Sequence, residues 1–323
     1  MAICKISEAR LRLIKKRQWS DAWGPDYVAA QWATPKEAPG LSTASILHPE
    51  KLGGRACHTL SQNETWVTLL ALYHPDVWEI HEQRVLFPQP RPHPLQGHPK
   101  ALGQKFEPFR GTLEVAQKMG TLSKHPKCRV TLDDRSVVYA PFPYLGDLLI
   151  FLMDDGGAYA VNLSVKDKLE SFRRQGPRPG KPDIHKDHAG TVNRHALEKR
   201  YYEDAGIPTR QVVGREIDLD LRVNLIDLFL CHAESTAIPE AVKHQMWIFF
   251  ASSIGLNKNA CVLINAAANH FKFDPAEVRT VLMQGIWRRH IKVDLFKPLL
   301  MDRPLRPMVD DPLQSYKEWF QRG

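Results

Sequence analysis

An aspartate, a tight turn and a lysine form the part of this sequence whose residue types could do chemistry. Asp147 precedes the apolar stretch Leu148–Met153. The run Asp154–Gly157 then leads into an alternating stretch that ends at Lys166. An Asp-Gly pair between two such stretches predicts a β-hairpin. A turn centred in this run places Asp147 about 5 Å from Ser164 on the facing strand, with Lys166 diagonal to it at roughly 7 to 8 Å.

The same hairpin also has an ordinary structural interpretation. In that interpretation Asp147 ends a strand, and Lys166 is a surface lysine that protects a sheet edge. Side-chain alternation puts Ser164 and Lys166 on one face and Val165 on the opposite, core face. The hairpin alone favours the structural interpretation. Whether Asp147 and Lys166 are catalytic or structural therefore depends on the other features of the sequence.

Composition narrows the class of protein. A chain of 323 residues is long enough for two domains, and its formal net charge of +8 favours a polyanionic partner such as DNA. The sequence has no apolar run near the length of a membrane span and no secretion-signal pattern, so we expect a cytoplasmic protein without a membrane partner. Its five cysteines are widely spaced and include no Cys-x-x-Cys pair, which argues against a zinc site or a disulfide framework.

The first eighteen residues are predicted to be helical and basic, with Arg10 and Arg17 among their cations. Such a segment could lie along DNA phosphates as a basic arm. The alternative is a solvated, frayed terminus, and the sequence leaves this choice open.

The element pattern predicts an α/β fold, with a mixed sheet flanked by helices, over residues 1–218. Apolar residues recur at helical or alternating spacing in the segments that would build it. Helices are predicted over 61–73, 111–119 and 192–205, and strands over 77–83, 129–138 and 209–213.

From residue 219 the pattern changes to consecutive helices. They are predicted over 239–253, 257–270 and 274–285, and the alternating stretch Ile286–Asp294 follows them. Three helices and a β wing suggest a winged-helix domain over residues 219–323.

A metal-dependent nuclease needs a further acid, and Glu64 is the best candidate. It stands just before a helical run, where Ser61 and Glu64 also fit a capping box, a purely structural role. Glu79 and Glu82 are competing acids on the strand candidate that follows. Because they lie three positions apart, an odd spacing that points their side chains to opposite faces of a strand, at most one of the two would face the site.

Several segments taken together resemble TnsA, the endonuclease subunit of heteromeric cut-and-paste transposons. The resemblance covers most of the chain, and its motifs are specific in combination. The matching segments are His58-Thr59-Leu60-Ser61-x-x-Glu64 and Pro75–Gln83 within Tyr27–Gln83, Gly146–Ile150 with Ser164–Lys166, Glu198–Tyr202 running to Gly206–Pro208, and Arg279–Leu305.

The resemblance implies a restriction-endonuclease-like core with Glu64, Asp147 and Lys166 as catalytic residues. It implies that Glu64 and Asp147, together with Ser164 and Val165, bind Mg²⁺, with Mn²⁺ as the alternative ion. The implied activity is hydrolysis of phosphodiester bonds at the 5′ ends of the transposon. The implied partners are transposon-end DNA, a TnsB-like transposase, and a TnsC-like AAA+ ATPase that docks on the C-terminal domain.

One position departs from the family pattern, which has Gln or Glu where this chain has Ser164. A serine hydroxyl is shorter and uncharged, so metal ligation there needs a water or the backbone carbonyl of Val165. The alternative function is therefore a catalytically weakened, DNA-binding scaffold that links the transposase and the AAA+ regulator. An independent restriction or repair nuclease is a third option.

Overall fold

The structure is a computed structural model that describes residues 6–40, 42–174 and 187–323. It is a mixed α/β protein whose chain divides into two units. The N-terminal unit comprises residues up to 68, 76–215 and 319–323, and the C-terminal unit comprises 69–75 and 216–318. The predicted boundary after residue 218 lies close to the observed change at 215, but the last five residues return to the N-terminal unit.

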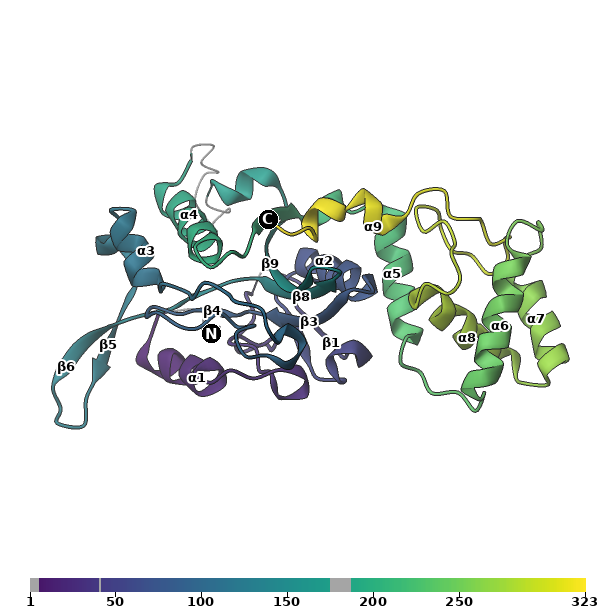
Figure 1. Cartoon of the computed structure of the whole chain (residues 1–323), viewed down its shortest axis with the longest axis horizontal. Coiled ribbons are helices and arrows are strands. Elements are labelled where there is room, and N and C mark those ends of the chain that lie inside the picture. Colours follow the sequence, from purple (N-terminus) through teal and green to yellow (C-terminus); the bar gives the residue numbers. More distant parts are fainter. Residues whose placement is uncertain (1–5, 41, 175–186) are drawn as a thin grey trace. The chain divides into compact units, whose positions relative to one another are not determined.

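A four-stranded mixed sheet forms the centre of the N-terminal unit (Figure 1). In spatial order the strands are β10 (Thr209–Val213), β9 (Gly157–Lys166), β8 (Leu148–Asp154) and β3 (Val77–Glu82). The β8–β9 and β8–β3 pairs are antiparallel, whereas β9 and β10 run parallel.

The predicted hairpin and its register are confirmed. Leu148 pairs with Leu163 and Asp154 pairs with Gly157, which leaves Asp147 and Ser164 as the next facing positions. The Asp154 carboxylate accepts a hydrogen bond from the Gly156 amide at 2.8 Å and so stabilises the turn.

Both faces of this sheet are buried. On one face Leu149 and Phe151 pack in a core that includes Leu197 and Tyr201 of helix α4 (Ala189–Glu203). Leu148, Ile150 and Leu163, on the opposite face, are also buried. The sequence predicted one core face; the second is covered because α4 lies against it.

The basic N-terminal segment is not an arm or a frayed end in its described part. Helix α1 (Glu8–Gln18) packs into a core through the buried Leu11 and Ile14. The Arg10 guanidinium donates to Gln31 at 2.5 Å, and Arg17 forms a paired contact with the Glu37 carboxylate at 2.7 and 2.8 Å. These two arginines therefore stabilise the fold.

Shorter elements complete the N-terminal unit. The helices are α2 (Gln62–Tyr73), whose last turn belongs to the C-terminal unit, and α3 (Thr112–Lys118), and the strands are β1 (Ser45–Leu47), β2 (Cys57–Thr59), β4 (Val85–Leu86), β5 (Lys127–Thr131), β6 (Val137–Pro141) and β7 (Tyr144–Leu145). Single 3₁₀ turns occupy Gly24–Asp26, Glu50–Leu52, Pro99–Ala101, Leu122–Lys124, Leu169–Phe172 and Gly214–Glu216.

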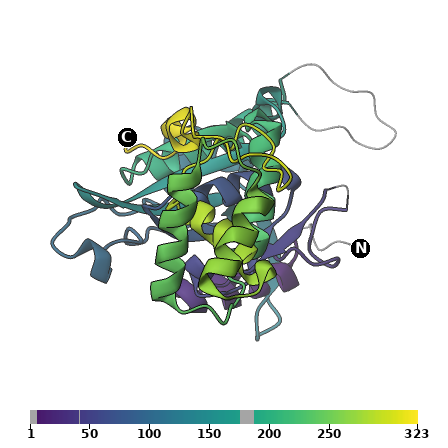
Figure 2. The same cartoon turned by 90° about the vertical axis from the view of Figure 1, so that its right-hand side faces the viewer.

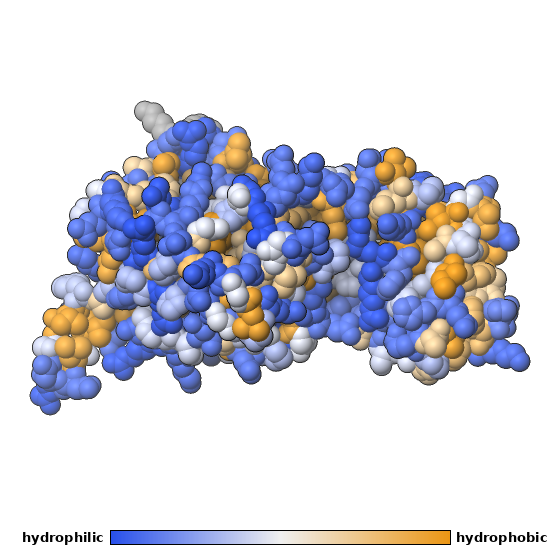
Figure 3. All heavy atoms as spheres, in the orientation of Figure 1, coloured by the Kyte–Doolittle hydropathy of each residue, from blue (hydrophilic) through white to orange (hydrophobic). Residues whose placement is uncertain are grey.

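The single strand predicted over 129–138 is wrong, because β5 and β6 form a separate antiparallel hairpin. A turn interrupts the alternating pattern: the Asp134 carboxylate accepts from the Ser136 amide at 2.9 Å, and Arg135 has a positive φ of 66°. The hairpin projects from the unit and exposes apolar side chains, including Val137 and Tyr139 (Figures 1 and 3).

The C-terminal unit is built from helices that pack on one another (Figure 2). They are α5 (Leu219–Cys231), α6 (Glu240–Ser253), α7 (Ala260–Phe271), α8 (Pro275–Trp287) and the short α9 (Pro312–Ser315), with a 3₁₀ turn at Lys317–Trp319 that ends beyond the unit. Trp247 of α6 donates its indole N–H to the Val281 carbonyl of α8 at 2.9 Å. A Cβ on Gly285 would lie 2.5 Å from the Trp247 ring, so only glycine allows this close packing.

The strand pair predicted over Ile286–Asp294 does not form. Helix α8 continues through Trp287, and an isolated bridge joins Val293 to Pro307. The alternating apolar residues Ile291, Val293 and Leu295 are buried, and this burial explains their spacing without a β ladder. In the described part of the chain, no helix is long and apolar enough to cross a membrane.

After the C-terminal unit, the chain returns to the central hairpin of the N-terminal unit. Tyr159 donates its hydroxyl proton to the Phe320 carbonyl at 3.0 Å. Arg322 binds both carboxylate oxygens of Asp154, at 2.6 and 2.7 Å.

Candidate active site

A pocket of about 630 Å³ opens in the N-terminal unit and brings the sequence-predicted residues together. Its wall includes Glu64 from the first turn of α2, Asp147 just before β8, and Val165 and Lys166 from the end of β9. Asp167 and Arg194 also line it. All three predicted catalytic side chains therefore lie on one pocket.

Asp147 and Lys166 form the centre of this site. The Lys166 ammonium lies 3.1 Å from Asp147 Oδ2 and donates to its neighbour's carbonyl, Val165 O, at 2.7 Å. The Val165 amide also donates to Asp147 Oδ2, at 2.7 Å. Burial opposes ionisation of Asp147, but the charges of Lys166 and Arg194 hold the pKa of this carboxyl below its usual value.

The two hydrogen bonds to this carboxylate both reach the same oxygen, Oδ2. Asp147 Oδ1 accepts no hydrogen bond from any residue in the described part of the chain, and the side chain is 14% exposed. A carboxylate fixed through one oxygen and open at the other is suited to bind a cation or a water molecule.

Glu64 combines the capping role with a place in the pocket. Its amide donates to the Ser61 hydroxyl at 3.2 Å, which is one half of a capping box, but its carboxylate accepts from that hydroxyl at 2.9 Å and not from the Ser61 amide. Its second oxygen accepts from the Leu60 amide and from Gln83 Nε2, both at 2.9 Å. The structural and the functional interpretation of Glu64 are thus compatible, because one carboxylate serves the helix start and the pocket wall.

The protonation of Glu64 depends on this environment. Burial, and next to it the negative charge of Asp147, raises its pKa from 4.5 to about 7. Two carboxyl groups that interact this strongly, one of them holding a proton near neutral pH, attract a divalent cation that would let both ionise.

Ser164 lies apart from the pocket wall. Its hydroxyl lies 3.5 Å from His195 Nδ1 of α4, and that nitrogen is 3.7 Å from the buried carboxylate of Glu198. The Val165 residue, in contrast, lines the pocket. Of the predicted metal ligands in this strand, the backbone carbonyl of Val165 is therefore better placed than the Ser164 side chain.

The competing acids Glu79 and Glu82 serve another purpose. Neither lines the pocket. Arg55 binds Glu82 through one guanidinium nitrogen at 2.9 and 3.0 Å and approaches Glu79 with the other at 3.4 Å. The same arginine donates to the Ile80 carbonyl, so it lies along the outer edge of β3 and neutralises both acids there.

The residues in the pocket fit a hard divalent cation. Glu64 and Asp147 supply carboxylate oxygens and Val165 supplies a carbonyl, which are the ligands that Mg²⁺ prefers. Within the described ranges, no cluster of three or more His, Cys, Asp or Glu side chains could hold a metal, so water or substrate oxygens would have to complete the coordination. The chain matches no protein-family model, and it matches no curated protein. The chemistry of this site therefore has to be argued from its geometry.

Arg194 lines the pocket but could not be singled out from the sequence. It belongs to α4, and one of its guanidinium nitrogens donates to the Leu145 carbonyl at 2.9 Å. Nothing in its sequence context distinguishes it from the neighbouring Lys199 and Arg200. Only the packing of α4 across the sheet brings it to the pocket.

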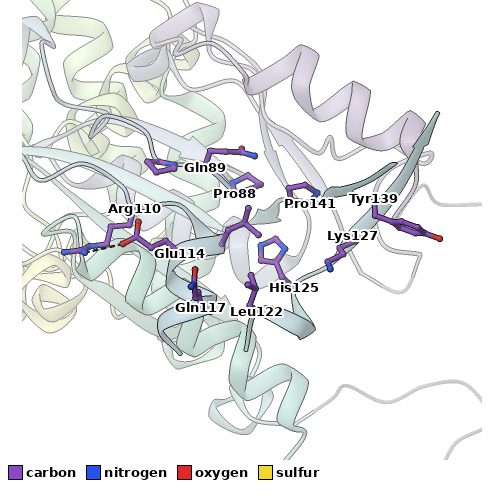
Figure 4. Close-up of a pocket in the computed structure, with 12 residues that line it drawn as sticks. Pro88, Gln89, Arg110, Glu114, Gln117, Leu122, His125, Lys127, Tyr139 and Pro141 are labelled. Carbon is purple, nitrogen blue, oxygen red and sulfur yellow. Dashed lines mark hydrogen bonds and ion pairs between the residues drawn. The ribbon is translucent and has the colours of Figure 1, made fainter. Parts of the chain in front are cut away.

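A second pocket, of about 540 Å³, lies beside the β5–β6 hairpin and α3 (Figure 4). Among the described residues that line it, the one carboxylate is Glu114, which pairs with Arg110 at 3.4 Å and with Lys118 at 2.8 Å. The rest of its wall is largely apolar, with Leu122 and Tyr139. It lacks the acids that a metal-dependent hydrolase would need.

The raised pKa of Glu64 predicts a pH-dependent stability. Between pH 4.5 and about 7 the folded protein holds a proton that the unfolded chain has lost, so the free energy of unfolding falls as pH rises through this window. The loss approaches about 3 kcal/mol at pH 8. Glu64→Gln lacks this titration, so relative to the wild type it should gain stability from pH 5 to pH 8 in denaturant unfolding with EDTA.

Glu240→Gln is a control for this measurement, because Glu240 is an exposed acid of α6 that forms an ion pair with Lys243. Its stability relative to the wild type should stay nearly constant over the same pH range. Equal effects of Glu64→Gln at pH 5 and pH 8 would show that Glu64 ionises normally.

Proposed function

We propose that this protein is a metal-dependent DNA endonuclease, with a restriction-endonuclease-like core, that cuts the 5′ ends of a transposon as the TnsA-like subunit of a heteromeric transposase. The observation that carries the proposal is the convergence of Glu64, Asp147 and Lys166 on one pocket, with Asp147 bonded to the lysine and open at its other oxygen. The resemblance of the sequence to TnsA supplies the biological context.

Four residues of the site have a role in this proposal. Glu64, Asp147 and the Val165 carbonyl would hold Mg²⁺ or Mn²⁺. Such an ion would polarise the scissile phosphate and acidify the attacking water. Lys166, a cation anchored at Asp147, would orient that water or stabilise the negative charge that develops on the phosphate. Asp147 thus fixes the ammonium group as well as contributing an oxygen ligand.

The proposed partners are transposon-end DNA, a TnsB-like transposase and a TnsC-like AAA+ ATPase. The net charge of +8 supports the DNA partner. For the ATPase we propose the C-terminal unit, as a winged-helix-like domain in which α6, α7 and α8 pack together. That unit exposes Ile248 and Leu256, and such apolar side chains suit a protein partner.

Ser164 favours a second candidate function. Its hydroxyl lies against His195 and so is not available as a metal ligand in the pocket. The Asp167 carboxylate accepts a hydrogen bond from Ser171 at 2.7 Å. The candidate metal-binding carboxylates are then the two of Glu64 and Asp147. A weakly metallated protein would act as a DNA-binding scaffold between the transposase and the regulator.

The test is DNA nicking by the wild type and Lys166→Met, with Mg²⁺ or Mn²⁺, on supercoiled DNA carrying transposon ends and with the partner subunits present. Loss of the lysine should slow nicking by about 10²- to 10³-fold, the range found when one charge-stabilising donor is removed. Lys168→Met, which removes an exposed lysine two residues further along the chain, is the matched control. Equal, metal-independent nicking by all three proteins would favour the scaffold.

A further inference from the structure

Arg194 is the feature of the pocket that the proposed chemistry leaves unused. Its side chain is partly exposed on the pocket wall, and its contact with the Leu145 carbonyl uses one of five guanidinium N–H donors. The carbonyl holds the planar group in place at the pocket, and the remaining donors are available to a ligand.

Two interior arginines of this unit, Arg17 and Arg55, are paired with carboxylates. Arg17 binds Glu37 and Arg55 binds Glu82. In the part of the chain that the structure describes, Arg194 has no such ion pair. Its positive charge nevertheless acts on the site, because it helps to lower the pKa of Asp147. Among the described residues of the pocket, Lys166 is thus a cation that is paired with an acid, and Arg194 is a cation that is not.

The walls of the pocket suit an anionic ligand at this position. Gln62 and Asn63, from the first turn of α2, also line it, and the N-terminal end of a helix carries partial positive charge. A guanidinium fork matches the geometry of phosphate oxygens and binds them through two parallel hydrogen bonds. A phosphate is therefore the ligand class that this part of the pocket fits.

We propose that Arg194 binds a phosphate group of the DNA backbone in this pocket and so positions the strand beside the Asp147–Lys166 pair. The inference rests on the proposed function in taking DNA as the ligand. It adds a substrate-binding residue on α4, a helix that carries none of the three predicted catalytic residues.

The experiment measures binding and not cleavage. Fluorescence anisotropy with a short labelled DNA duplex, in EDTA and over a series of NaCl concentrations, gives the slope of log affinity against log salt. Each phosphate contact contributes about 0.9 to that slope on duplex DNA. Arg194→Gln should therefore bind more weakly and show a slope smaller by about 0.9. Arg194→Lys, which keeps the charge, should recover most of the slope.

Arg200→Gln is the matched control. Arg200 lies on the same helix and is exposed, but its guanidinium is already paired with Asp204 at 2.6 Å. Its removal should leave the slope unchanged. Melting curves of all variants verify that each one is folded at the temperature of the measurement.

The outcomes separate this inference from the proposed function. A reduced slope for Arg194→Gln, in a protein that never cuts DNA, would support the phosphate site and reject the nuclease. A wild-type slope and affinity for Arg194→Gln, in a protein that cuts DNA with metal, would overturn the phosphate site alone. A reduction of the same size in Arg200→Gln would also overturn it, because the effect would then reflect net charge.

Discussion

Replacement of Asp147 by asparagine is expected to slow metal-dependent DNA nicking by about a thousandfold or more. Asparagine keeps the shape of the side chain but removes the negative charge that holds Lys166 and that would hold a cation in the proposed function. A thousandfold lower rate corresponds to a loss of about 4 kcal/mol of transition-state stabilisation, because each factor of ten corresponds to about 1.4 kcal/mol. The measurement is the rate of conversion of supercoiled to nicked plasmid in Mg²⁺, with the partner subunits present.

The same substitution at the far end of β8 provides the control. Asp154 ends this strand and binds the exposed Arg322. Asp154→Asn should leave nicking within about twofold of the wild type, because exposed ion pairs contribute about 1 kcal/mol or less to stability. A rate for Asp147→Asn that matches that of Asp154→Asn would reject Asp147 as a catalytic residue.

Replacement of Arg55 by methionine is expected to destabilise the fold by about 3 to 5 kcal/mol. The Arg55 side chain is 4% exposed, and those of Glu79 and Glu82 are 4% and 0% exposed. Without the guanidinium, two carboxylates stay buried and unpaired. Burial already raises the pKa of Glu82, so in the variant this carboxylate would take up a proton at low pH and lose its unpaired charge. The loss in free energy of unfolding should therefore be smaller at pH 5 than at pH 8.

Urea unfolding at both pH values measures this effect. Arg12→Met, which breaks an exposed pair with Glu8, should change the free energy of unfolding by less than about 1 kcal/mol. Adding Glu82→Gln to Arg55→Met should recover part of the loss. An Arg55→Met deficit that is equal at the two pH values would argue that lost packing, and not the buried charge, dominates.

The parts of the site that could be predicted from the sequence are those fixed by local geometry. An Asp-Gly turn between two apolar strands sets its own register, so the relation of Asp147 to Ser164 and Lys166 followed from counting. The hydrogen bond from the Glu64 amide to the Ser61 side chain is likewise local and follows from spacing, although the Glu64 carboxylate reaches the Leu60 amide and not that of Ser61.

The parts that could not be predicted depend on contacts between distant segments. Arg194 reaches the pocket because α4 packs across the sheet, and no local pattern marks it. The ion pairs of Arg55 join a loop to a strand 24 and 27 residues away. Alternation within β9 correctly grouped Ser164 with Lys166, but it could not show that His195 would lie against the serine.

The return of the chain after the C-terminal unit has a practical consequence. Residues 216–318 are covalently joined to the N-terminal unit at both ends, so this stretch is an insertion and not an appended tail. A truncation at residue 218 would also remove Phe320 and Arg322, the partners of Tyr159 and Asp154. A better-bounded fragment of the N-terminal unit would replace the insertion with a short linker and retain the last five residues, so that the turn of the central hairpin keeps its partners.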